Sequence, residues 1–465
     1  MSPTTAATPS TAFAAYRERL QAELVPTLPG QLSRVSWGRD RIVGHQRERL
    51  AALLAHAAER SPFHARRLAG VDPDAVDPRD LSALPVMTKA EMMAALDDVF
   101  TDRRLGTRLV ESALAAGTAE PQPILGEYVA FTSGGSSGRR GVYVFDPPAL
   151  RQFLGSLCRG LVARIEAMGG PPPGGLPIAM VSARSAVHPT GGAAQFAGGA
   201  LPFHFVPVPA TLPVPEIVER LNAVQAPLLY GYASMIERLA AEQRAGRLRI
   251  RPLTVTCTSE TLTPEMRAAV RDGFGVPVID TFGSTEGLVG ASPPDGEAIV
   301  FAEDGCIVEL VDEHHRPVPP GTPSAKVLVT NLENRVQPLI RYELTDVLTA
   351  QPGDGHLRAT VSGRSDESFR WEGVTVHPFV VRSVLVGVPQ IAEYQVRQTG
   401  AGVAVTAVAA AGAGTVDTDG VAAEVAAALA RAGLRRPDVT VRLAPALDRD
   451  PATGKLRRFV PLPGR

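Results

Sequence analysis

The chain has 465 residues, of which 45% are hydrophobic, so it can bury a large core and divide into two or three domains. Its 47 Lys and Arg residues almost balance its 48 Asp and Glu residues, which gives a formal net charge of -1. This balance excludes a general electrostatic attraction to nucleic acid or to an anionic membrane, so any anion must be bound by a local site.

The three cysteines, Cys158, Cys257 and Cys306, lie far apart and form no CxxC pair. This spacing argues against a disulfide framework and against a structural zinc site, and it fits a reducing cytoplasm. Cys257 lies in the apolar run TVTCTS and is expected to be buried and inert. Because no leader pattern and no apolar run of roughly 18 residues occurs, we expect a soluble cytoplasmic protein without a membrane span.

Two helices are predicted in the first hundred residues. In residues 41–70, Leu50, Leu53, Leu54 and Ala57 share one helical face, and Ser61-Pro62 is a typical stop signal. After Pro85, Thr88 is followed three residues later by Glu91, which is the capping-box arrangement.

From about residue 125 to 350, short β-rich runs alternate with helical ones, an order typical of a mostly parallel α/β architecture. The predicted strands are YVAFTS, PIAMVSA, FHFVPV, APLLYGY, LTVTCTS, PVIDTFGS and KVLVTNL. After roughly residue 363 the pattern changes to two or three strands, an Ala-rich helix and a basic tail. We therefore expect a large domain at residues 1–363 and a small α+β domain at residues 364–465.

The segment FTSGGSSGRRG at 131–141 resembles a phosphate-binding loop without its lysine. Gly134 and Gly138 allow a tight turn whose amides converge on an anion, and Thr132, Ser133, Ser136 and Ser137 add hydroxyl donors. The Walker pattern is absent, so a P-loop NTPase is excluded, although Arg139 and Arg140 could clamp a phosphate. Taken alone, a Gly/Ser-rich segment of this kind is more often a plain turn than a phosphate-binding loop.

Five further motifs follow the loop in order: TSETLTPEM (258–266), DTFGSTEG (280–287), NRVQPLIRYELTD (334–346), GRSDESFRWEGVTVHP (363–378) and TGKLRRF (453–459). The series resembles the adenylate-forming superfamily of acyl-CoA synthetases and adenylation domains, and within it the phenylacetate-CoA ligase-like branch. The resemblance covers nearly the whole chain. It implies a large multi-sheet N-terminal α/β domain that binds nucleotide and substrate, and a small mobile C-terminal lid that carries a catalytic lysine.

DTFGSTEG follows the apolar strand PVID, so it lies at a strand's carboxyl end, where α/β sheets bind ligands. Phe282 could stack on a flat ring, Thr285 could bond an oxyanion, and Glu286 could ligate Mg²⁺; otherwise the segment is a glycine turn with a solvated glutamate. The resemblance assigns this stretch to the adenine and the α-phosphate. The nucleotide-binding residues that it implies are Thr132, Ser133, Gly134, Ser136, Ser137, Gly138, Ser259, Glu260, Asp280, Phe282, Gly283, Ser284, Asp346 and Arg364.

Asp346 matches the aspartate that accepts the ribose hydroxyls in this family, and Arg364 matches an arginine near the ribose or the phosphates. Thr345 stands where the family usually has glycine. Asp366 matches the hinge about which the small domain rotates, whereas Ser368-Phe369-Arg370 departs from the usual apolar-apolar-lysine pattern. The departure at Thr345 affects the local turn before Asp346. The departure at Ser368-Phe369-Arg370 affects the contacts that the family makes in its second half-reaction.

Lys455 in PATGKLRRF is either part of a solvated basic tail or the mobile lysine that the resemblance implies. In the second case it bridges the carboxylate and the α-phosphate as charge builds in the transition state. The catalytic residues expected on this basis are Lys455, Thr285 and Glu286, with Glu286 also the metal ligand.

The resemblance implies ATP and Mg²⁺, with coenzyme A as the acceptor thiol or a carrier protein acting in trans. A homodimer is compatible with the sequence. Tyr230-Gly231-Tyr232 ends the strand APLLYGY and is placed either to line an acyl pocket, together with His188 and His204, or to belong to the core. Each histidine also has a purely structural interpretation.

Three functions remain open from the sequence. The first is adenylation of an aryl, arylacetic or cinnamic-type acid, followed by transfer to a thiol. The second is activation of another oxyanion, such as nitrite for diazotisation of an aryl amine, because the nucleotide machinery does not specify the attacking oxygen. The third is a non-catalytic nucleotide-binding regulator, which the retention of Glu286, Asp346, Arg364 and Lys455 disfavours.

Overall fold

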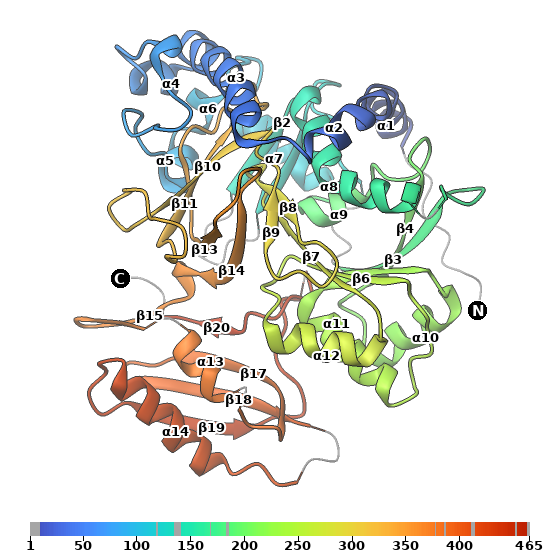
Figure 1. Ribbon diagram of the computed structural model, residues 1–465, viewed down its shortest axis with the longest axis vertical. Coiled ribbons are helices and arrows are strands. Elements are labelled where there is room, and N and C mark those ends of the chain that lie inside the picture. Colours follow the sequence, from blue (N-terminus) through green and yellow to red (C-terminus); the bar gives the residue numbers. More distant parts are fainter. Residues whose placement is uncertain are drawn as a thin grey trace. The chain divides into compact units, whose positions relative to one another are not determined.

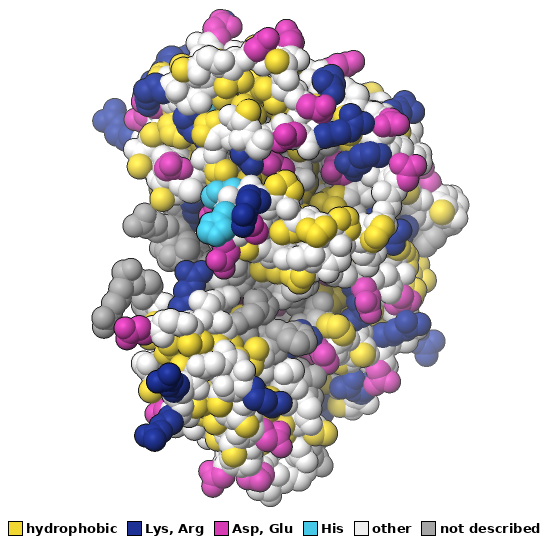
Figure 2. Space-filling model, turned by 60° about the vertical axis from the view of Figure 1, so that its left-hand side comes forward, with side chains coloured by type: hydrophobic (Ala, Val, Ile, Leu, Met, Phe, Trp, Pro, Cys, Tyr) yellow, Lys and Arg dark blue, Asp and Glu magenta, His cyan; other side chains and the backbone are white. Residues whose placement is uncertain are grey.

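The computed structural model describes residues 10–117, 120–133, 141–167, 169–182, 186–376, 378–385, 387–410, 414–451 and 453–462. The chain divides into two compact units, Met1–Ser362 and Gly363–Arg465, whose elements are labelled in Figure 1. In the described ranges, none of the helices combines the length and the apolar character that a membrane crossing requires. Acidic and basic side chains are interspersed over the face shown in Figure 2, in keeping with the balanced net charge.

Helices form the N-terminal part of the first unit. They are α1 (Thr11–Leu24), α2 (Leu28–Arg34), α3 (Arg39–Arg60), α4 (Pro62–Arg67), α5 (Lys89–Ala94), α6 (Leu96–Val99) and α7 (Thr107–Ala116), with 3-10 turns at Val25–Thr27 and Pro73–Ala75.

Two local predictions for these helices are confirmed. Leu50, Leu53 and Leu54 are fully buried along one face of α3, and the helix ends before Ser61, whose hydroxyl accepts a hydrogen bond from the His64 amide at the start of α4. The capping box of Thr88 and Glu91 begins α5.

A nine-stranded sheet is the centre of this unit, with the order β13-β14-β9-β8-β7-β6-β5-β3-β4. Its strands are β3 (Leu176–Ser182), β4 (Phe203–Pro209), β5 (Leu228–Tyr232), β6 (Thr254–Thr258), β7 (Val278–Gly283), β8 (Val289–Ala291), β9 (Ile299–Phe301), β13 (Asp346–Gln351) and β14 (Arg358–Arg364). Strands β4, β3, β5, β6 and β7 run parallel. In their register Val181, Gly231, Cys257 and Asp280 stand side by side, so the carboxyl ends of β3, β5, β6 and β7 meet at one edge.

The parallel strands are covered by helices on both faces, as Figure 1 shows. On one face lie α8 (Pro147–Ala167) and α9 (Pro189–Ala194), and on the other α10 (Val214–Val224), α11 (Ala233–Arg244) and α12 (Pro264–Phe274). The first face belongs to the largest hydrophobic core cluster and the second face to a separate one. Alternate side chains of each strand therefore enter different cores, as the pleat of a strand requires.

Two smaller antiparallel sheets complete the first unit: a hairpin of β1 (Val129–Ser133) and β2 (Gly141–Phe145), and a sheet of β10 (Cys306–Val311), β11 (Lys326–Asn331) and β12 (Tyr342–Leu344). All seven predicted strand segments form strands. Those at β1 and β11, however, lie outside the parallel sheet, because each pairs antiparallel with a strand that is its neighbour in the chain.

The second unit is a small α+β fold. Its four-stranded sheet has the order β19-β18-β17-β20 and packs against helices over its own core. The elements are a 3-10 turn (Ser365–Glu367), β15 (Phe369–Trp371), β16 (Val374–Val376), α13 (Phe379–Leu385), β17 (Ile391–Gln398), β18 (Gly402–Ala409), α14 (Thr418–Arg431), β19 (Asp438–Leu443) and β20 (Phe459–Val460). The Ala-rich segment is the helix α14, capped by Asp417. The predicted α/β fold class with several sheets is confirmed.

Candidate active site

Hydroxyl groups gather at the edge where the parallel strands end. Thr258 closes β6, and its Oγ1 donates a hydrogen bond of 3.1 Å to the carbonyl of Thr281 on β7. The next residue, Ser259, has a left-handed φ of 63°, and its Oγ lies 3.0 Å from Thr190 Oγ1 on α9. A left-handed backbone is unfavourable for serine and persists only where its surroundings hold it. The edge is therefore a fixed polar rim, at the position where α/β sheets commonly bind ligands.

The turn after β7 carries Glu286, three residues beyond the end of the strand at Gly283. Glu286 is only 8% exposed, and its backbone carbonyl accepts a hydrogen bond of 3.0 Å from Asn331 Nδ2 on β11. The following residue, Gly287, has φ 102°, and a Cβ atom there would lie 2.2 Å from Asn331 Nδ2. Glycine is thus required for both conformation and space.

Tyr143 holds the Glu286 carboxylate and is itself in contact with Tyr342, and neither tyrosine was assigned a role from the sequence motifs. Tyr143 Oη on β2 donates to Glu286 Oε1 at 2.7 Å, and the hydroxyl of Tyr342 on β12 lies 2.8 Å from Tyr143 Oη. Burial and the neighbouring Glu286 carboxylate raise the pKa of Tyr143 well above its ordinary value, so the phenol keeps its proton. Tyr342 belongs to the motif that ends at Asp346, so this chain of contacts joins two motifs.

Both arms of the Gly/Ser loop are attached near the rim. The Thr132 amide donates a hydrogen bond of 2.8 Å to the carbonyl of Val187, two residues before α9. Ser133 Oγ accepts from Gly141 N at 3.2 Å and from Lys89 Nζ at 3.0 Å. Lys89 was missed because it lies 44 residues from Ser133 in the chain. The predicted cradle residues Gly134, Ser136, Ser137 and Gly138, with Arg139 and Arg140, lie outside the described residues.

The chemistry of Glu286 fits a magnesium ion. In the described part of the chain, Tyr143 alone donates to this carboxylate, and it does so on Oε1. A carboxylate with a second oxygen at a phosphate-binding edge is the kind of ligand that Mg²⁺ takes together with phosphates and waters. Among the described residues, no three His, Cys, Asp or Glu side chains gather as a protein-only metal site.

Several predicted nucleotide residues have local contacts of their own. Glu260 Oε2 accepts a hydrogen bond of 2.8 Å from the Ser234 amide in the first turn of α11. Phe282 packs edge-on against Phe301, with ring centroids 5.3 Å apart. Asp280 pairs in register with Cys257 on the side of the sheet that α10, α11 and α12 cover. Burial raises the pKa of its carboxyl to about 7.

The remaining motif residues are distributed over both units. Half-buried Asp346 begins β13, directly after Thr345, and Arg364 ends β14. Asp366 lies in the 3-10 turn Ser365–Glu367, and its side chain lies outside the described residues. Lys455 is half-buried in the second unit, where its amide donates to Thr453 Oγ1 at 3.3 Å and its carbonyl accepts from Asp450 N at 2.9 Å. The roles of these residues stay predictions.

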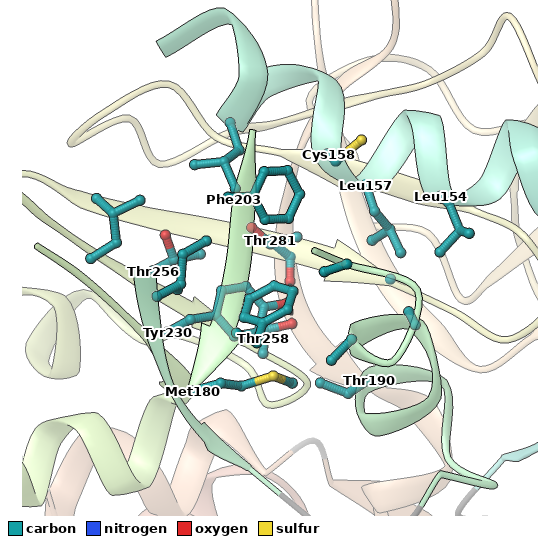
Figure 3. Close-up of a pocket in the computed structure, with 18 of the residues that line it drawn as sticks. Leu154, Leu157, Cys158, Met180, Thr190, Phe203, Tyr230, Thr256, Thr258 and Thr281 are labelled. Atoms are coloured by element: carbon teal, nitrogen blue, oxygen red, sulfur yellow. Dashed lines mark hydrogen bonds between the residues drawn. The ribbon is translucent and has the colours of Figure 1, made fainter. Parts of the chain in front are cut away.

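A large cavity lies between α8 and the parallel sheet (Figure 3). Its walls are mostly apolar, and it opens to solvent. At the strand edge it is bounded by Ser259, Thr281 and Gly283. The close-up shows Leu154, Leu157 and Cys158 on the helix opposite Tyr230, Thr256 and Thr258 on the strands.

Only one of the five residues predicted for an acyl pocket lines this cavity. Tyr230 does so, whereas Tyr232, at the junction of β5 and α11, is buried in the core beneath α10–α12. Gly231 packs tightly, because a Cβ atom there would lie 2.7 Å from the Val181 carbonyl. His188 precedes α9 and its Nδ1 lies 3.4 Å from the Thr132 carbonyl, and His204 is half-buried on β4.

Comparisons with known proteins agree with this architecture, although no family model matches the chain. A phenylacetate-coenzyme A ligase of Thermus thermophilus is 27% identical over 383 residues, which cover 77% of this chain and 78% of that protein. A namesake from Aromatoleum evansii is 27% identical over 144 residues, 29% of this chain and 32% of its own length.

Solved structures share the fold. A 2-hydroxyisobutyryl-CoA ligase in its postadenylation state, in complex with 2-HIB-AMP, has a TM-score of 0.65 at 19% identity and covers 90% of this chain and 88% of its own. An anthranilate CoA ligase in complex with anthranoyl-AMP has a TM-score of 0.50 at 16% identity over 70% and 64% of the two chains. Together with the six ordered motifs, these likenesses support the resemblance of the chain to adenylate-forming ligases of the phenylacetate-CoA ligase-like branch.

Proposed function

We propose that this ligase activates an aryl carboxylic acid with ATP and passes the acyl group to the thiol of coenzyme A. The observation that carries the proposal is the apolar cavity, which ends at the same strand edge that bears Ser259, Thr281 and the turn to Glu286. An acid seated in this cavity directs its carboxylate to that edge, which carries residues of two of the proposed nucleotide motifs. The names of the similar ligases support the same chemistry.

The aryl character of the acid follows from the walls. Phe153, Phe203, Phe205 and Tyr230 line the cavity among aliphatic side chains. Aromatic rings provide large flat apolar surfaces against which another ring packs favourably.

In the first step a carboxylate oxygen attacks the α-phosphorus of ATP, the bond to the β-phosphate breaks, and pyrophosphate leaves. Thr285, the hydroxyls of the Gly/Ser loop and Lys455 donate to the oxygens on which negative charge builds, which lowers the barrier mainly by positioning and electrostatics. Asp346 accepts the ribose hydroxyls and Arg364 faces the ribose or the phosphates. Glu286 would hold Mg²⁺, which would supply neutralisation of the phosphate charge.

In the second step the thiol of coenzyme A attacks the acyl carbon and AMP leaves with the bonding electrons of the anhydride. Rotation about Asp366 would exchange the face that the small unit presents between the two steps. A carrier-protein thiol acting in trans is the other acceptor with the same chemistry.

Pyrophosphate release measured over a panel of aryl acids, with and without coenzyme A, tests the proposal. Acid-dependent release and a coenzyme A thioester detected by mass spectrometry are expected. Pyrophosphate release that depends on nitrite and an aryl amine would mean that the substrate is another oxyanion and not a carboxylic acid. No pyrophosphate release with any oxyanion would mean that the protein binds nucleotide without catalysis.

Lys455→Ala should reduce acid-dependent release by about 100- to 1000-fold, as expected for loss of a charged transition-state partner. Arg457→Ala, which removes an exposed cation two residues away, is the matched control and should keep most of the activity. Equal activity of the two variants would remove the catalytic role from Lys455.

A further inference from the structure

We infer that the acid carries a second anionic group, best matched by a carboxylate, which the guanidinium of Arg164 binds at the end of the cavity opposite the nucleotide edge. The inference rests on the proposed function and narrows its substrate class. The observations that carry it are the charge of the cavity wall, the course of α8 and the surroundings of Arg164.

Arg164 is the one charged residue among the described residues that line the cavity. The other polar groups there are the hydroxyls of threonines, Ser259 and Tyr230, together with the thiol of Cys158. The positive potential of this guanidinium is not offset, because none of the described lining residues carries a carboxylate. An anionic ligand would supply the missing charge.

The course of α8 separates Arg164 from the nucleotide edge. Leu157 lies at that edge, since a Cβ atom at Gly283 would be 3.6 Å from its Cδ2. The backbone of Arg164 follows seven residues later on the same helical face, about 10 Å further along the axis. Its guanidinium reaches back by one turn toward Gly160, where a Cβ atom would lie 3.6 Å from Nη1. Because α8 ends at Ala167 and β3 begins at Leu176, its last turn lies toward the amino ends of the strands.

The sheet side gives a similar length. Thr254, Thr256 and Thr258 follow one another at alternate positions of β6 and all line the cavity. Four residues of strand span about 13 Å. The cavity is therefore long enough for a rigid aryl acid to place one carboxylate at the rim and a second group at the far end.

Arg164 is also poorly hydrated for a cation. It is half-buried, burial lowers its pKa, and no acidic neighbour raises it. No hydrogen bond or ion pair joins its side chain to another of the described residues, whereas Arg151 on the same helix pairs with Glu23. A guanidinium without such a partner among these residues can bind the two oxygens of a ligand carboxylate.

The test compares 4-carboxycinnamate with its neutral 4-methyl and 4-nitro analogues, which have the same rigid frame. In the unaltered enzyme, 4-carboxycinnamate should have the lowest KM in pyrophosphate release. Arg164→Met, which keeps much of the length but removes the charge, should raise this KM by about 10- to 100-fold and leave the KM of the 4-methyl acid within about twofold. Arg164→Lys should be intermediate, because it keeps the charge but not the fork.

Arg151→Met is the matched control on α8, and it should change none of the three KM values. Calorimetric binding of 4-carboxycinnamate without ATP, lost in Arg164→Met, gives a readout that does not require turnover. Equal KM values for the three acids in the unaltered enzyme, or an equal rise for all of them in Arg164→Met, would overturn the inference while leaving adenylation intact. Absence of release with every acid would instead contradict the proposed function.

Discussion

The two faces of the parallel part of the sheet are built from the same strands and do different work. On β6, Val255 and Cys257 are fully buried beneath α10–α12. The alternate residues Thr254, Thr256 and Thr258 line the cavity beneath α8. The face beneath α10–α12 (the covered face) is filled and mostly apolar, whereas the face beneath α8 (the cavity face) leaves an open volume edged by hydroxyls. A strand can therefore serve stability and ligand binding at once, because its side chains alternate between faces.

This contrast predicts that effects on stability and effects on kinetics can be separated by mutation. Changes on the covered face should alter the free energy of unfolding with little effect on substrate binding. Changes on the cavity face and at its rim should alter kinetics with little effect on stability.

The largest effect is expected at the rim, from Glu286→Gln. The amide keeps the shape and the hydrogen bond from Tyr143 but loses the charge, so pyrophosphate release should fall by about 100- to 1000-fold. The urea midpoint of unfolding should stay nearly unchanged. Glu297→Gln, at an exposed site, is the control. A large fall in stability for Glu286→Gln would show that the separation fails at the rim.

A pair of leucines, one on each face of the sheet, tests the contrast between the faces. Leu239 on α11 is fully buried, so Leu239→Ala should lower the free energy of unfolding by about 2 to 5 kcal/mol and leave the KM of the acid unchanged. Leu157 on α8 borders the cavity, so Leu157→Ala removes fewer packing contacts and should cost about 1 kcal/mol or less while changing that KM. Chemical denaturation and steady-state kinetics on both variants check the pair. Equal losses of stability would contradict the contrast between the faces.

A third prediction concerns Asp280, on the covered face. Its pKa is raised to about 7 in the folded chain from an ordinary value of 3.8, so the folded state binds the proton more tightly than the unfolded state. The contribution of Asp280 to stability should therefore be most favourable at low pH and decline as pH rises toward about 7, by about 1.4 kcal/mol per pH unit between the two values.

Urea unfolding between pH 5 and 8, compared for the unaltered chain and Asp280→Asn, measures this effect. The asparagine variant should lose most of that pH dependence and be the more stable of the two near pH 8. A pH profile shared by both chains would mean that other groups set it.

The smallest effect is expected from Thr256→Val on the cavity face. The change removes one hydroxyl and keeps the side-chain volume, so stability should shift by less than about 1 kcal/mol. The KM of the acid should change by no more than about tenfold. A stability loss as large as that of Leu239→Ala would place Thr256 in the packed core rather than on an open wall.

Much of the architecture follows from local patterns. The alternation of TVTCT already separates threonines from Val255 and Cys257, and the strand order of the motifs predicts that polar groups meet at one edge. Tyr232 could not be assigned in this way. It stands at the last position of β5, where the chain turns into α11 and the alternation of the strand no longer decides which core a side chain enters.

The supports of the site were beyond the reach of the sequence. Tyr143 meets Glu286 across 143 residues of chain, and Lys89 meets Ser133 across 44. Neither tyrosine nor lysine has a local signature, since a single buried tyrosine in a strand is ordinary core. Tertiary packing alone brings these groups together.

The contact between Gly287 and Asn331 limits which substitutions either position can accept during evolution. The amide of Asn331 fills the space in which any larger residue at 287 would need its first side-chain carbon. A mutation at either position therefore encounters the other as its nearest obstacle, and divergence at one should be accompanied by replacement at the other. In a collection of homologous sequences, these two sites should covary although 44 positions separate them.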